Sequence, residues 1–354
     1  MRIRHITAIK EIPFGKDQWN ELVSLSETNT VFQTHEWFMS WWLTFGSDNT
    51  LFLLILYDRE RVAGIAPMML SRKWKTRELR FVSDINADYC DFIVSSSEKE
   101  AMLSAVFDYL QKNNNLWDSI YLMNIPETSS TASLLRSIFL HHRLHAVASQ
   151  VDCPVLKFGK DSADSRLKPS RTLKRHLNYF KKNGDLRFII FKSLPIAEKS
   201  LDIFYTQHKR RWKNAGKPSL FNDGRYTLFY NELVRRAWPS GWLFFSCLQF
   251  NGQPISFHFG FDYSNKVIWY KPTFDIGFRN RSPGRILLQY LIQYCQDHNK
   301  LELDFTVGNE PFKEEYATDV RKNVNFWITR SKLMHNLVVI FLKAKQLKRR
   351  LANR

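Results

Sequence analysis

Cysteine is scarce in this sequence: its 354 residues include only four, Cys90, Cys153, Cys247 and Cys295. These four lie far apart, with neither a CxxC pair nor a Cys/His cluster at metal-ligand spacing. The pattern excludes a disulfide-stapled secreted scaffold and a zinc finger, and it predicts no metal site. We expect buried, unpaired thiols in a reducing compartment.

Long hydrophobic runs are also missing. The opening residues MRIRHITAIKEIPFGKDQWNE contain no apolar core of signal-peptide length. The run from Leu337 to Leu342 is far too short to cross a bilayer. The sequence therefore predicts a cytoplasmic protein, and a peripheral position at the inner face of a membrane is left open.

Acidic residues are outnumbered by basic ones. There are 34 Asp and Glu against 52 Lys and Arg, which gives a formal net charge of +18. Such an excess favours anionic partners: a phosphorylated cofactor, a nucleic acid or an anionic membrane surface. Two stretches without any acid stand out, Arg166 to Lys182 and a predicted basic helix from Ser331 to Arg354. A solvated face is the alternative for the first stretch, and a helix simply packed on the fold is the alternative for the second.

The sequence does contain the pattern of a full-sized globular protein. A hydrophobic fraction of 44% with 15% aromatic residues predicts bulky cores, and 354 residues suit two domains. Apolar runs around short polar turns predict hairpins at 51–70 and 242–263, the second with an Asn251-Gly252 turn. Periodicity predicts helices at 101–111, 170–183, 197–214 and 222–238, and further strands at 119–123, 186–191 and 266–274.

The most informative stretch runs from Trp269 to Tyr316 and predicts a strand, a basic turn, a helix, a second strand and another helix. At the first helix start, Ser282 is a candidate cap, Pro283 suits the first turn and Gly284 lets a ligand approach the backbone. Helix starts attract anions because their N–H groups lack partners and the helix dipole favours negative charge. The nearby cations that strengthen this prediction are Arg279, Arg281 and Arg285. An ordinary capped helix with solvated arginines is the competing interpretation.

Several motifs, in their order along the chain, resemble one known family. In the second half they are Ser282-Pro283-Gly284, Asp304-Phe305, Gly308 and Lys313; in the first half they are 31–46, 62–70 and 88–94. Together they resemble the GNAT-type N-acetyltransferases, and more specifically the cellulose-biosynthesis acetyltransferases, which are relatives of the Fem peptidyltransferases. The turn RNRSPGR departs from the glycine-rich Q/R-x-x-G-x-G/A signature of typical GNAT enzymes. The resemblance therefore bears more on the fold than on the cofactor.

The resemblance implies an α/β (α+β) fold of tandem GNAT-like lobes, each a mixed, largely antiparallel twisted sheet flanked by helices. The implied parts are a degenerate lobe at 1–160, a basic connecting helix at 161–185, an acyl-CoA-binding lobe at 186–330 and a basic C-terminal helix at 331–354.

The implied activity is transfer of an acyl group, most simply acetyl from acetyl-CoA. The implied acceptor is a sugar or lipid-linked sugar used in bacterial exopolysaccharide or envelope assembly. One alternative is a Fem-like aminoacyl-tRNA-dependent transferase. The other is a non-catalytic basic module that binds nucleic acid or a membrane synthase. Apart from tRNA, no nucleic acid is expected under the transferase interpretations.

Acyl transfer needs a group that takes the acceptor's proton, and the candidate catalytic residues are Asp304, Lys313 and His258. Asp304 is interpreted either as this base or as a residue that orders the turn after it, and His258 as a catalyst or a core histidine. The candidate cofactor-binding residues are Tyr270, Lys271, Arg279, Arg281, Ser282, Gly284 and Arg285. The candidate substrate-binding residues, expected to line a cleft between lobes, are Asp88, Asp91, Trp212 and Tyr316. For the two aspartates a turn-forming role is the alternative.

Two more features bear on the expected site. Pro272 cannot donate a ladder hydrogen bond, which predicts a bulge near Lys271-Pro272 that opens a cleft for the pantetheine arm of coenzyme A. A tryptophan stripe at helical spacing, Trp37, Trp41 and Trp42, predicts core packing over stacking on a sugar.

Overall fold

The computed structural model describes residues 1–73, 76–159, 168–340 and 344, and the chain divides into two compact units. Unit 1 is Met1–Val151 together with the chain from Arg321 onward, and unit 2 is Asp152–Val320. The predicted boundaries after 160 and 330 lie further along the chain than the observed ones after 151 and 320. The first residues of the predicted connecting helix, 161–167, lie outside the described residues, and the rest of it belongs to unit 2.

Unit 1 is built on a mixed sheet with the strand order β1-β2-β3-β4-β6-β13, and β5 pairs with β3. Its strands are antiparallel neighbours except for β4 and β6, which are parallel and are joined through helix α3. The strands are β1 (Arg2–Ile6), β2 (Asn49–Asp58), β3 (Arg61–Lys73), β4 (Thr76–Phe81), β5 (Ile93–Val94), β6 (Ser119–Pro126) and β13 (Asp319–Thr329). The helices are α1 (Lys16–Leu25), α2 (His35–Phe45), α3 (Lys99–Lys112) and α4 (Thr131–His141).

Unit 2 has a sheet in the order β8-β9-β10-β11-β12, and the end of β7 pairs with β12. Again one neighbouring pair is parallel, β11 with β12, and helix α8 joins these two strands. The strands are β7 (His145–Lys157), β8 (Leu186–Ile190), β9 (Leu243–Phe250), β10 (Gln253–Tyr263), β11 (Lys266–Phe274) and β12 (Glu302–Asp304). The helices are α5 (Arg171–Asn183), α6 (Leu194–Asn214), α7 (Gly224–Ala237), α8 (Pro283–Asp297) and α9 (Pro311–Tyr316).

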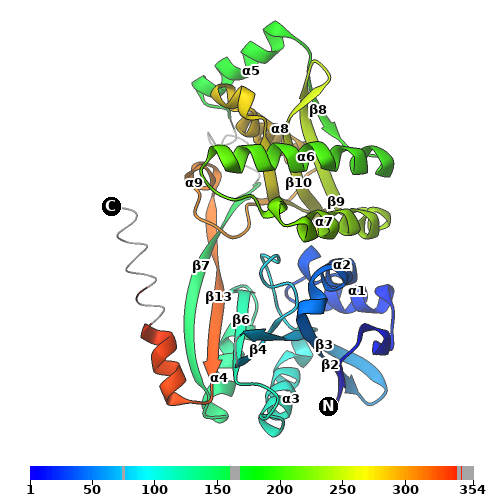
Figure 1. Cartoon of the computed structure of the whole chain (residues 1–354), viewed down its shortest axis with the longest axis vertical. Helices are drawn as coiled ribbons and strands as arrows, with labels where there is room; N and C mark the ends of the chain where they lie inside the picture. The colour runs from blue at the N-terminus through cyan, green and yellow to red at the C-terminus, as the bar shows by residue number, and fades with distance from the viewer. Residues whose placement is uncertain (74–75, 160–167, 341–343, 345–354) are drawn as a thin grey trace. The chain divides into compact units, whose positions relative to one another are not determined.

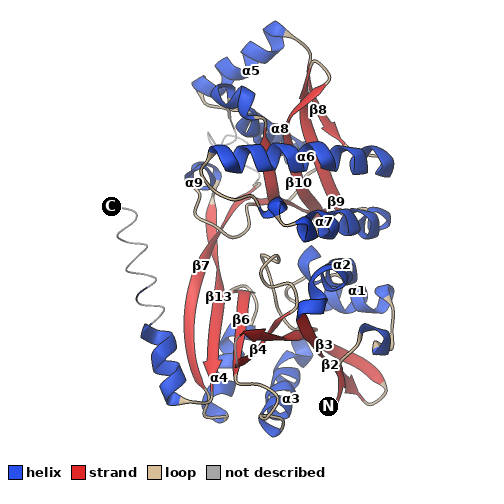
Figure 2. Ribbon diagram, in the orientation of Figure 1, coloured by secondary structure: helices blue, strands red, loops and turns tan. Residues whose placement is uncertain are grey.

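The sheet of unit 2 separates two helical layers, and α6 and α7 form the nearer one in Figures 1 and 2. Alternation along β10 assigns its side chains to these layers. Phe257 packs on Phe204 of α6, and Phe259 on Tyr230 of α7. On the opposite face a buried cluster joins α8 to β9, β11 and β12, with Phe244, Trp269, Leu288, Leu291 and Leu303 among its members. This second layer contains the helix whose start was predicted to bind an anion.

The two halves of the chain repeat one order of elements. β1, α1, α2, β2, β3, β4, α3, β6, α4 and β7 correspond in sequence order to β8, α6, α7, β9, β10, β11, α8, β12, α9 and β13. Their last strands are exchanged. β7 of the first half pairs with β12, as Leu156 does with Leu303, and β13 of the second half pairs with β6, as Ile328 does with Ile120. The exchange explains why the unit boundaries fall within these two long strands.

The local predictions made for the second half are largely confirmed. The hairpin of β9 and β10 turns at Asn251 and Gly252, whose φ values of 49° and 78° are those a two-residue turn of this kind requires. The basic helix α5 ends at Asn183, and its cap, Ser170, accepts a hydrogen bond from the Leu173 N–H. Helices α6 and α7 match their predicted spans to within a few residues.

Candidate functional site

The strands β11 and β12 pair at three positions and then separate. The last pair is Ile268 with Asp304, and no later pair between these two strands occurs in the described chain. The bulge between β10 and β11 lies at Gly260 opposite Trp269 and Tyr270, slightly earlier than the predicted Lys271-Pro272. Because Pro272 lies beyond the last β12 pair, its missing N–H leaves no ladder bond unmade on that side. Beyond Ile268, β11 is therefore no longer paired with β12, as the predicted opening of this edge requires.

A short 3-10 turn, Ile276–Arg281, connects the splayed end of β11 to helix α8. Asp275 caps this turn by accepting a hydrogen bond from the Gly277 N–H at 2.9 Å. Ser282 is the residue before α8 and has a left-handed backbone (φ 52°, ψ 48°), but its side chain makes no capping hydrogen bond. The predicted cap position is correct and the predicted cap bond is not. Pro283 opens the helix as expected, since its missing N–H costs nothing there.

A pocket of about 270 Å³ lies at this helix start. Aromatic and aliphatic side chains from β11, α8 and α9 form its apolar part, and three arginines supply its charge. It is lined by Arg211, Trp269, Pro272, Thr273, Phe274, Arg279, Ser282, Pro283, Gly284, Arg285, Leu288 and Phe312. A Cβ built on Gly284 would lie 3.5 Å from Phe274, which is ordinary contact, so the glycine keeps the pocket open without being required by the fold.

The three arginines of the pocket are held differently. Arg279 is exposed and forms no ion pair with any residue that the structure describes. Arg285 pairs with Glu315, and its guanidinium lies 5.9 Å from the ring centre of Tyr316. Arg211 of α6 donates a 2.8 Å hydrogen bond to the carbonyl of Pro272 and stacks 4.9 Å from the ring centre of Phe274.

Arg211 is the most unusual of these cations. Burial lowers the pKa of its guanidinium, and the more distant Glu310 carboxylate only partly offsets that effect. Arginine nevertheless stays charged at neutral pH. The guanidinium of Arg211 donates to a neutral carbonyl, so an anion in the pocket would give this cation a charged partner.

The other candidate cofactor-binding residues lie outside this pocket's lining. Tyr270 is buried against Phe261 and Tyr230, in the layer of α6 and α7. Lys271 lies over the Tyr270 ring at 4.0 Å. Arg281 stacks at the same distance, 4.0 Å, on the Tyr179 ring of α5. Of the predicted set, the structure brings together Arg279, Ser282, Gly284 and Arg285.

Asp304 and Lys313 order the turn that follows β12. Asp304 is 4% exposed and accepts a 2.8 Å hydrogen bond from the Thr306 N–H, and the Thr306 hydroxyl donates to the carbonyl of Trp269. Lys313 is 3% exposed and donates to the Val307 carbonyl at 3.0 Å. Its ammonium also pairs with Glu310 at 2.8 Å. Asp304 thus reaches the pocket wall through Thr306, whereas the charge of Lys313 already has a partner.

His258 is fully buried on the α8 face of β10. Its ring stacks on Trp269 at 4.9 Å, and Nε2–H donates a 3.2 Å hydrogen bond to the carbonyl of Ile268. Nδ1 has no hydrogen-bond partner among the described residues. Burial lowers the pKa of the imidazole to about 3, so the ring is neutral at physiological pH. This geometry favours the core interpretation of His258 over the catalytic one.

The two candidate substrate-binding residues of unit 2 lie on opposite helical layers. Trp212 of α6 stacks on His208 at 5.6 Å, and its indole N–H is buried without a partner in the described structure. Burial, with help from Arg211 and Lys271, lowers the pKa of His208 to about 3. Tyr316 is 5% exposed, and its hydroxyl accepts a long 3.5 Å hydrogen bond from Gln289 of α8.

The two candidate aspartates lie in unit 1, where Asp91 is the centre of a buried polar network. Its carboxylate accepts hydrogen bonds from the hydroxyls of Thr28, Ser129 and Thr131 and from the Phe92 N–H, and it pairs with Lys99 at 3.3 Å. Lys99 is the first residue of α3 and also pairs with Glu27 at 2.7 Å. A carboxylate with this many donors is a structural residue by geometry. Asp88 is half-buried, and its carbonyl accepts from the Asn323 side chain.

Helix α3 of unit 1 corresponds to α8 of unit 2, and its start is already occupied by the protein's own charges. Glu98 precedes the helix and pairs with Arg61, while Lys99 holds Asp91 and Glu27. An anionic ligand at this start would meet three carboxylates. That the first lobe is the degenerate one stays a prediction.

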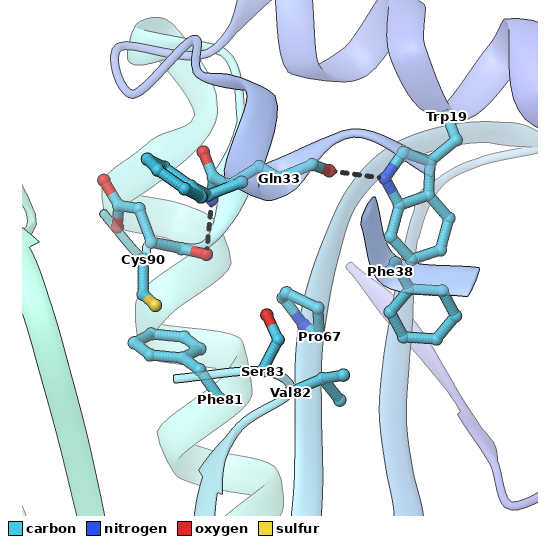
Figure 3. Close-up of a pocket in the computed structure, with 10 residues that line it drawn as sticks. Trp19, Gln33, Phe38, Pro67, Phe81, Val82, Ser83 and Cys90 are labelled. Carbon is cyan, nitrogen blue, oxygen red and sulfur yellow. Dashed lines mark hydrogen bonds between the residues drawn. The ribbon is translucent and has the colours of Figure 1, made fainter. Parts of the chain in front are cut away.

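Figure 3 shows a small pocket of about 20 Å³ in unit 1, with Trp19 donating to the carbonyl of Gln33. A space of this size holds about one water molecule and no sugar. The tryptophan stripe of α2 is structural too. Trp37 and Trp41 are buried, and their indole N–H groups donate to Ser83 and Asn86. The core interpretation of that stripe is confirmed for these two residues.

Sequence reasoning did not select Arg211, Phe274, Leu288 or Phe312 as site residues. Arg211 stands in the basic run HKRR near the end of a predicted helix, which was the available signal. The three apolar residues carry no signal, because a pocket wall and a core use the same side chains.

The described residues contain no group of three or more His, Cys, Asp or Glu side chains placed to hold a metal ion. Within the described part of the chain, no helix is long and apolar enough to cross a membrane.

Comparisons with known proteins agree with this architecture. Residues 168–314 match a family model described as an acetyltransferase (GNAT) domain. The crystal structure of FemX superposes with a TM-score of 0.66 at 10% sequence identity, covering 96% of this chain and 100% of that chain. A tandem GNAT protein from the clavulanic acid biosynthesis pathway gives 0.51 at 10% identity, with 93% and 98% covered. L-PGS from Bacillus licheniformis gives 0.55 at 10% identity, with 93% and 95% covered. No curated protein matches the chain.

The chain thus has the fold of tandem GNAT lobes, and residues 168–314 match the model of a GNAT acetyltransferase domain. The predicted fold class is confirmed. The narrower resemblance to cellulose-biosynthesis acetyltransferases stays a prediction.

Proposed function

We propose that unit 2 is the catalytic unit of an acyltransferase that takes its acyl group from an acyl-CoA thioester, most simply acetyl-CoA. The observation that carries the proposal is the pocket at the start of α8, where three arginines surround the backbone of Gly284 next to the end of the β11–β12 pairing. The N–H groups of Arg285 and Ile286 donate to the Ser282 carbonyl, so the N–H of Gly284 is the one offered to a ligand in this turn. In unit 1 the corresponding helix start, that of α3, is occupied by the carboxylates of Glu98 and Asp91. We therefore propose one donor site per chain, in unit 2.

The residues present fit a phosphorylated thioester. Arg279 and Arg285 would bind the diphosphate together with the N–H of Gly284 in the first turn of α8. The apolar walls of Trp269, Leu288 and Phe312 suit the uncharged pantetheine arm. The thioester, when bound, supplies an activated acyl carbon and a thiolate leaving group.

Asp304 is proposed as the group that takes the acceptor's proton. As the acceptor's amine or hydroxyl attacks the acyl carbon, the C–S bond breaks and the proton passes to the Asp304 carboxylate. The carboxylate lies at the strand end next to the pocket wall, connected to Trp269 through Thr306. Lys313 and His258 are secondary candidates, because one is already ion-paired and the other is buried. Trp212, with its unpaired indole N–H, is a candidate for holding the acceptor.

The acceptor proposed from the family resemblance is a sugar or lipid-linked sugar of bacterial exopolysaccharide or envelope assembly, which would place the reaction at the cytoplasmic side of the membrane. Asp88, Asp91 and Tyr316 remain proposals as substrate-binding residues. Asp91 is the least suited of these, because its carboxylate is occupied by internal donors.

The donor site is tested by calorimetry with acetyl-CoA on matched arginine variants. Arg279→Ala and Arg211→Ala should each weaken binding by about tenfold or more, since each removes a charge-assisted contact of about 1.5–3 kcal/mol. Arg281→Ala is the control: this arginine lies on the same turn but stacks on Tyr179, so its loss should change affinity little. If all three variants bind acetyl-CoA with equal affinity, or if the wild-type protein does not bind it, the proposed donor site is wrong.

The proposed base is tested with Asp304→Asn. The amide oxygen can still accept the Thr306 N–H, so the fold and acyl-CoA binding should persist while turnover falls ~100- to 10,000-fold. If Asp304 only orders the turn, the melting temperature, binding and turnover should fall together. A stable and fully active variant would contradict both roles.

An aminoacyl-tRNA donor is the second candidate, favoured by the fold shared with FemX and by the net charge of +18. Both donors present an activated acyl carbon, so β11, β12 and Asp304 could serve either. Binding of aminoacyl-tRNA with no measurable binding of acetyl-CoA would support this candidate. The absence of binding to either donor would support a non-catalytic basic module.

A further inference from the structure

The last described helix, at 332–340, presents large apolar side chains to solvent. Leu333 is 70% exposed, Leu337 52% and Ile340 63%, and Met334 beside them is 41% exposed. A surface helix of a soluble protein normally turns its apolar stripe inward and its polar face outward. Here the outward face is apolar. The inference drawn from this helix does not depend on the proposed transferase activity.

The exposed residues form one stripe. Leu333, Leu337 and Ile340 are spaced four and three residues apart, which places them on one side of the helix. The opposite side packs on unit 1: Val338 and Val339 are half-buried, and the His335 ring lies 5.6 Å from that of His145 of β7. The helix is therefore anchored through one side and leaves the other side uncovered.

The charge of the surrounding sequence indicates which kind of partner would bind the exposed stripe. From Ser331 to Arg354 the sequence carries Lys332, Lys343, Lys345, Lys348, Arg349, Arg350 and Arg354 and no acidic residue. An apolar stripe combined with a dense, purely basic sequence is the combination that binds in the interface of anionic bilayers. A hydrophobic groove of a partner protein could bind the apolar stripe, but binding there would not explain seven basic residues without any acidic one.

We propose that the helix at 332–340 binds the surface of an anionic lipid bilayer, lying in the interface with Leu333, Leu337 and Ile340 inserted and Lys332 at the headgroups. The apolar stripe contributes binding to any bilayer, and the cations make that binding selective for anionic lipid.

The test uses co-sedimentation of the full chain with vesicles of phosphatidylcholine, with and without phosphatidylglycerol. The wild-type chain should bind the anionic vesicles at least tenfold more strongly, and high salt should abolish the difference. Replacing Leu333, Leu337 and Ile340 together by serine should reduce binding about tenfold or more. Lys332→Gln should reduce it about fivefold, since each cation near the surface contributes about 1 kcal/mol.

A matched control replaces three exposed apolar residues elsewhere, Ile196, Ile203 and Leu228, by serine. These are 56%, 45% and 62% exposed and lie on α6 and α7, so their loss should leave vesicle binding unchanged. Equal binding to both vesicle types, equal effects of the two triple variants, or no vesicle binding would overturn the proposal. A dimer that the helix triple variant dissociates would overturn it in favour of a second copy of this chain as the partner.

A site-specific probe gives a second readout. All four native cysteines are buried, so Leu337→Cys should take a polarity-sensitive fluorophore selectively. Its emission should shift to the blue with anionic vesicles, while the same label at Leu228→Cys should not respond. A label at 337 that stays in a water-like environment would contradict insertion even if the chain sediments with the vesicles.

Discussion

The buried imidazole of His258 should make the stability of this protein depend on pH in a calculable way. In the unfolded chain the pKa of a histidine is about 6.5, whereas burial lowers the folded pKa of His258 to about 3. At pH values between these two pKa values, His258 is protonated in the unfolded state and neutral in the folded state. The contribution of His258 is therefore fully present above pH 6.5 and is lost progressively as the pH falls toward 3.

The size of the effect follows from the two pKa values. From pH 7.5 to pH 5 the free energy of unfolding should fall by about 2 kcal/mol on account of His258 alone. His208, whose pKa burial also lowers to about 3, should add a similar loss. His258→Gln removes the titrating group and retains an amide that can donate to the Ile268 carbonyl in place of Nε2–H. The variant should lose stability at every pH through its missing stacking on Trp269, but its pH slope should be smaller.

The assay is urea unfolding followed by far-ultraviolet circular dichroism at pH values from 5 to 9. The difference in unfolding free energy between wild type and His258→Gln should be constant from pH 7.5 to 9 and should shrink by about 2 kcal/mol on going to pH 5. Parallel curves over the whole range would refute the buried neutral imidazole. NMR titration of the ring offers an independent check. A His258 that titrates near pH 7 would restore it as a candidate proton carrier.

Three further outcomes are expected. Gly260→Ala should destabilise the protein by about 1–3 kcal/mol, because its Cβ would collide with the His258 ring in a packed core; a melting temperature equal to the wild type would contradict this packing. Lys99→Met should cost about 3–5 kcal/mol in urea unfolding by leaving the buried carboxylate of Asp91 without its cation, and a loss below about 1 kcal/mol would show that the hydroxyls alone hold it. The fragment 1–160 should fail to give a cooperative unfolding transition, because its sheet would lack β13.

Much of unit 2 could be predicted because its signals are local. The Asn251-Gly252 turn, the cap of α5 and Pro283 at the start of α8 each depend on neighbouring residues in the sequence. The end of the pairing between β11 and β12 was also predictable. Pro272 in β11 has no N–H to donate, and a proline within a strand indicates an edge without ladder hydrogen bonds. The exact position of that edge was not predictable, since the bulge at Gly260 is fixed by cross-strand register.

The candidate site was predicted only where charge and backbone chemistry mark it. Arg279, Gly284 and Arg285 stand at a recognisable helix start and do line the pocket. Arg281 has the same sequence signal but stacks on Tyr179 of α5, a contact that sequence spacing cannot reveal. Arg211 shows the reverse case: it reaches the pocket from α6, more than sixty residues away, through a hydrogen bond to the Pro272 carbonyl.

The exchange of β7 and β13 shows why domain boundaries resist prediction from composition. The basic, polar stretch near residue 160 separates the two halves that repeat one order of elements, and its composition predicts a linker between folding units. Each repeat nevertheless gives its last strand to the other unit, so that Leu156 lies beside Leu303 and Ile328 beside Ile120. Each strand carries buried apolar residues, such as Val155 and Leu156 in β7 and Phe326 and Ile328 in β13, and the apolar pattern alone does not assign either strand to one sheet. Which sheet receives each strand is decided by cross-strand packing, an interaction between residues far apart in the sequence.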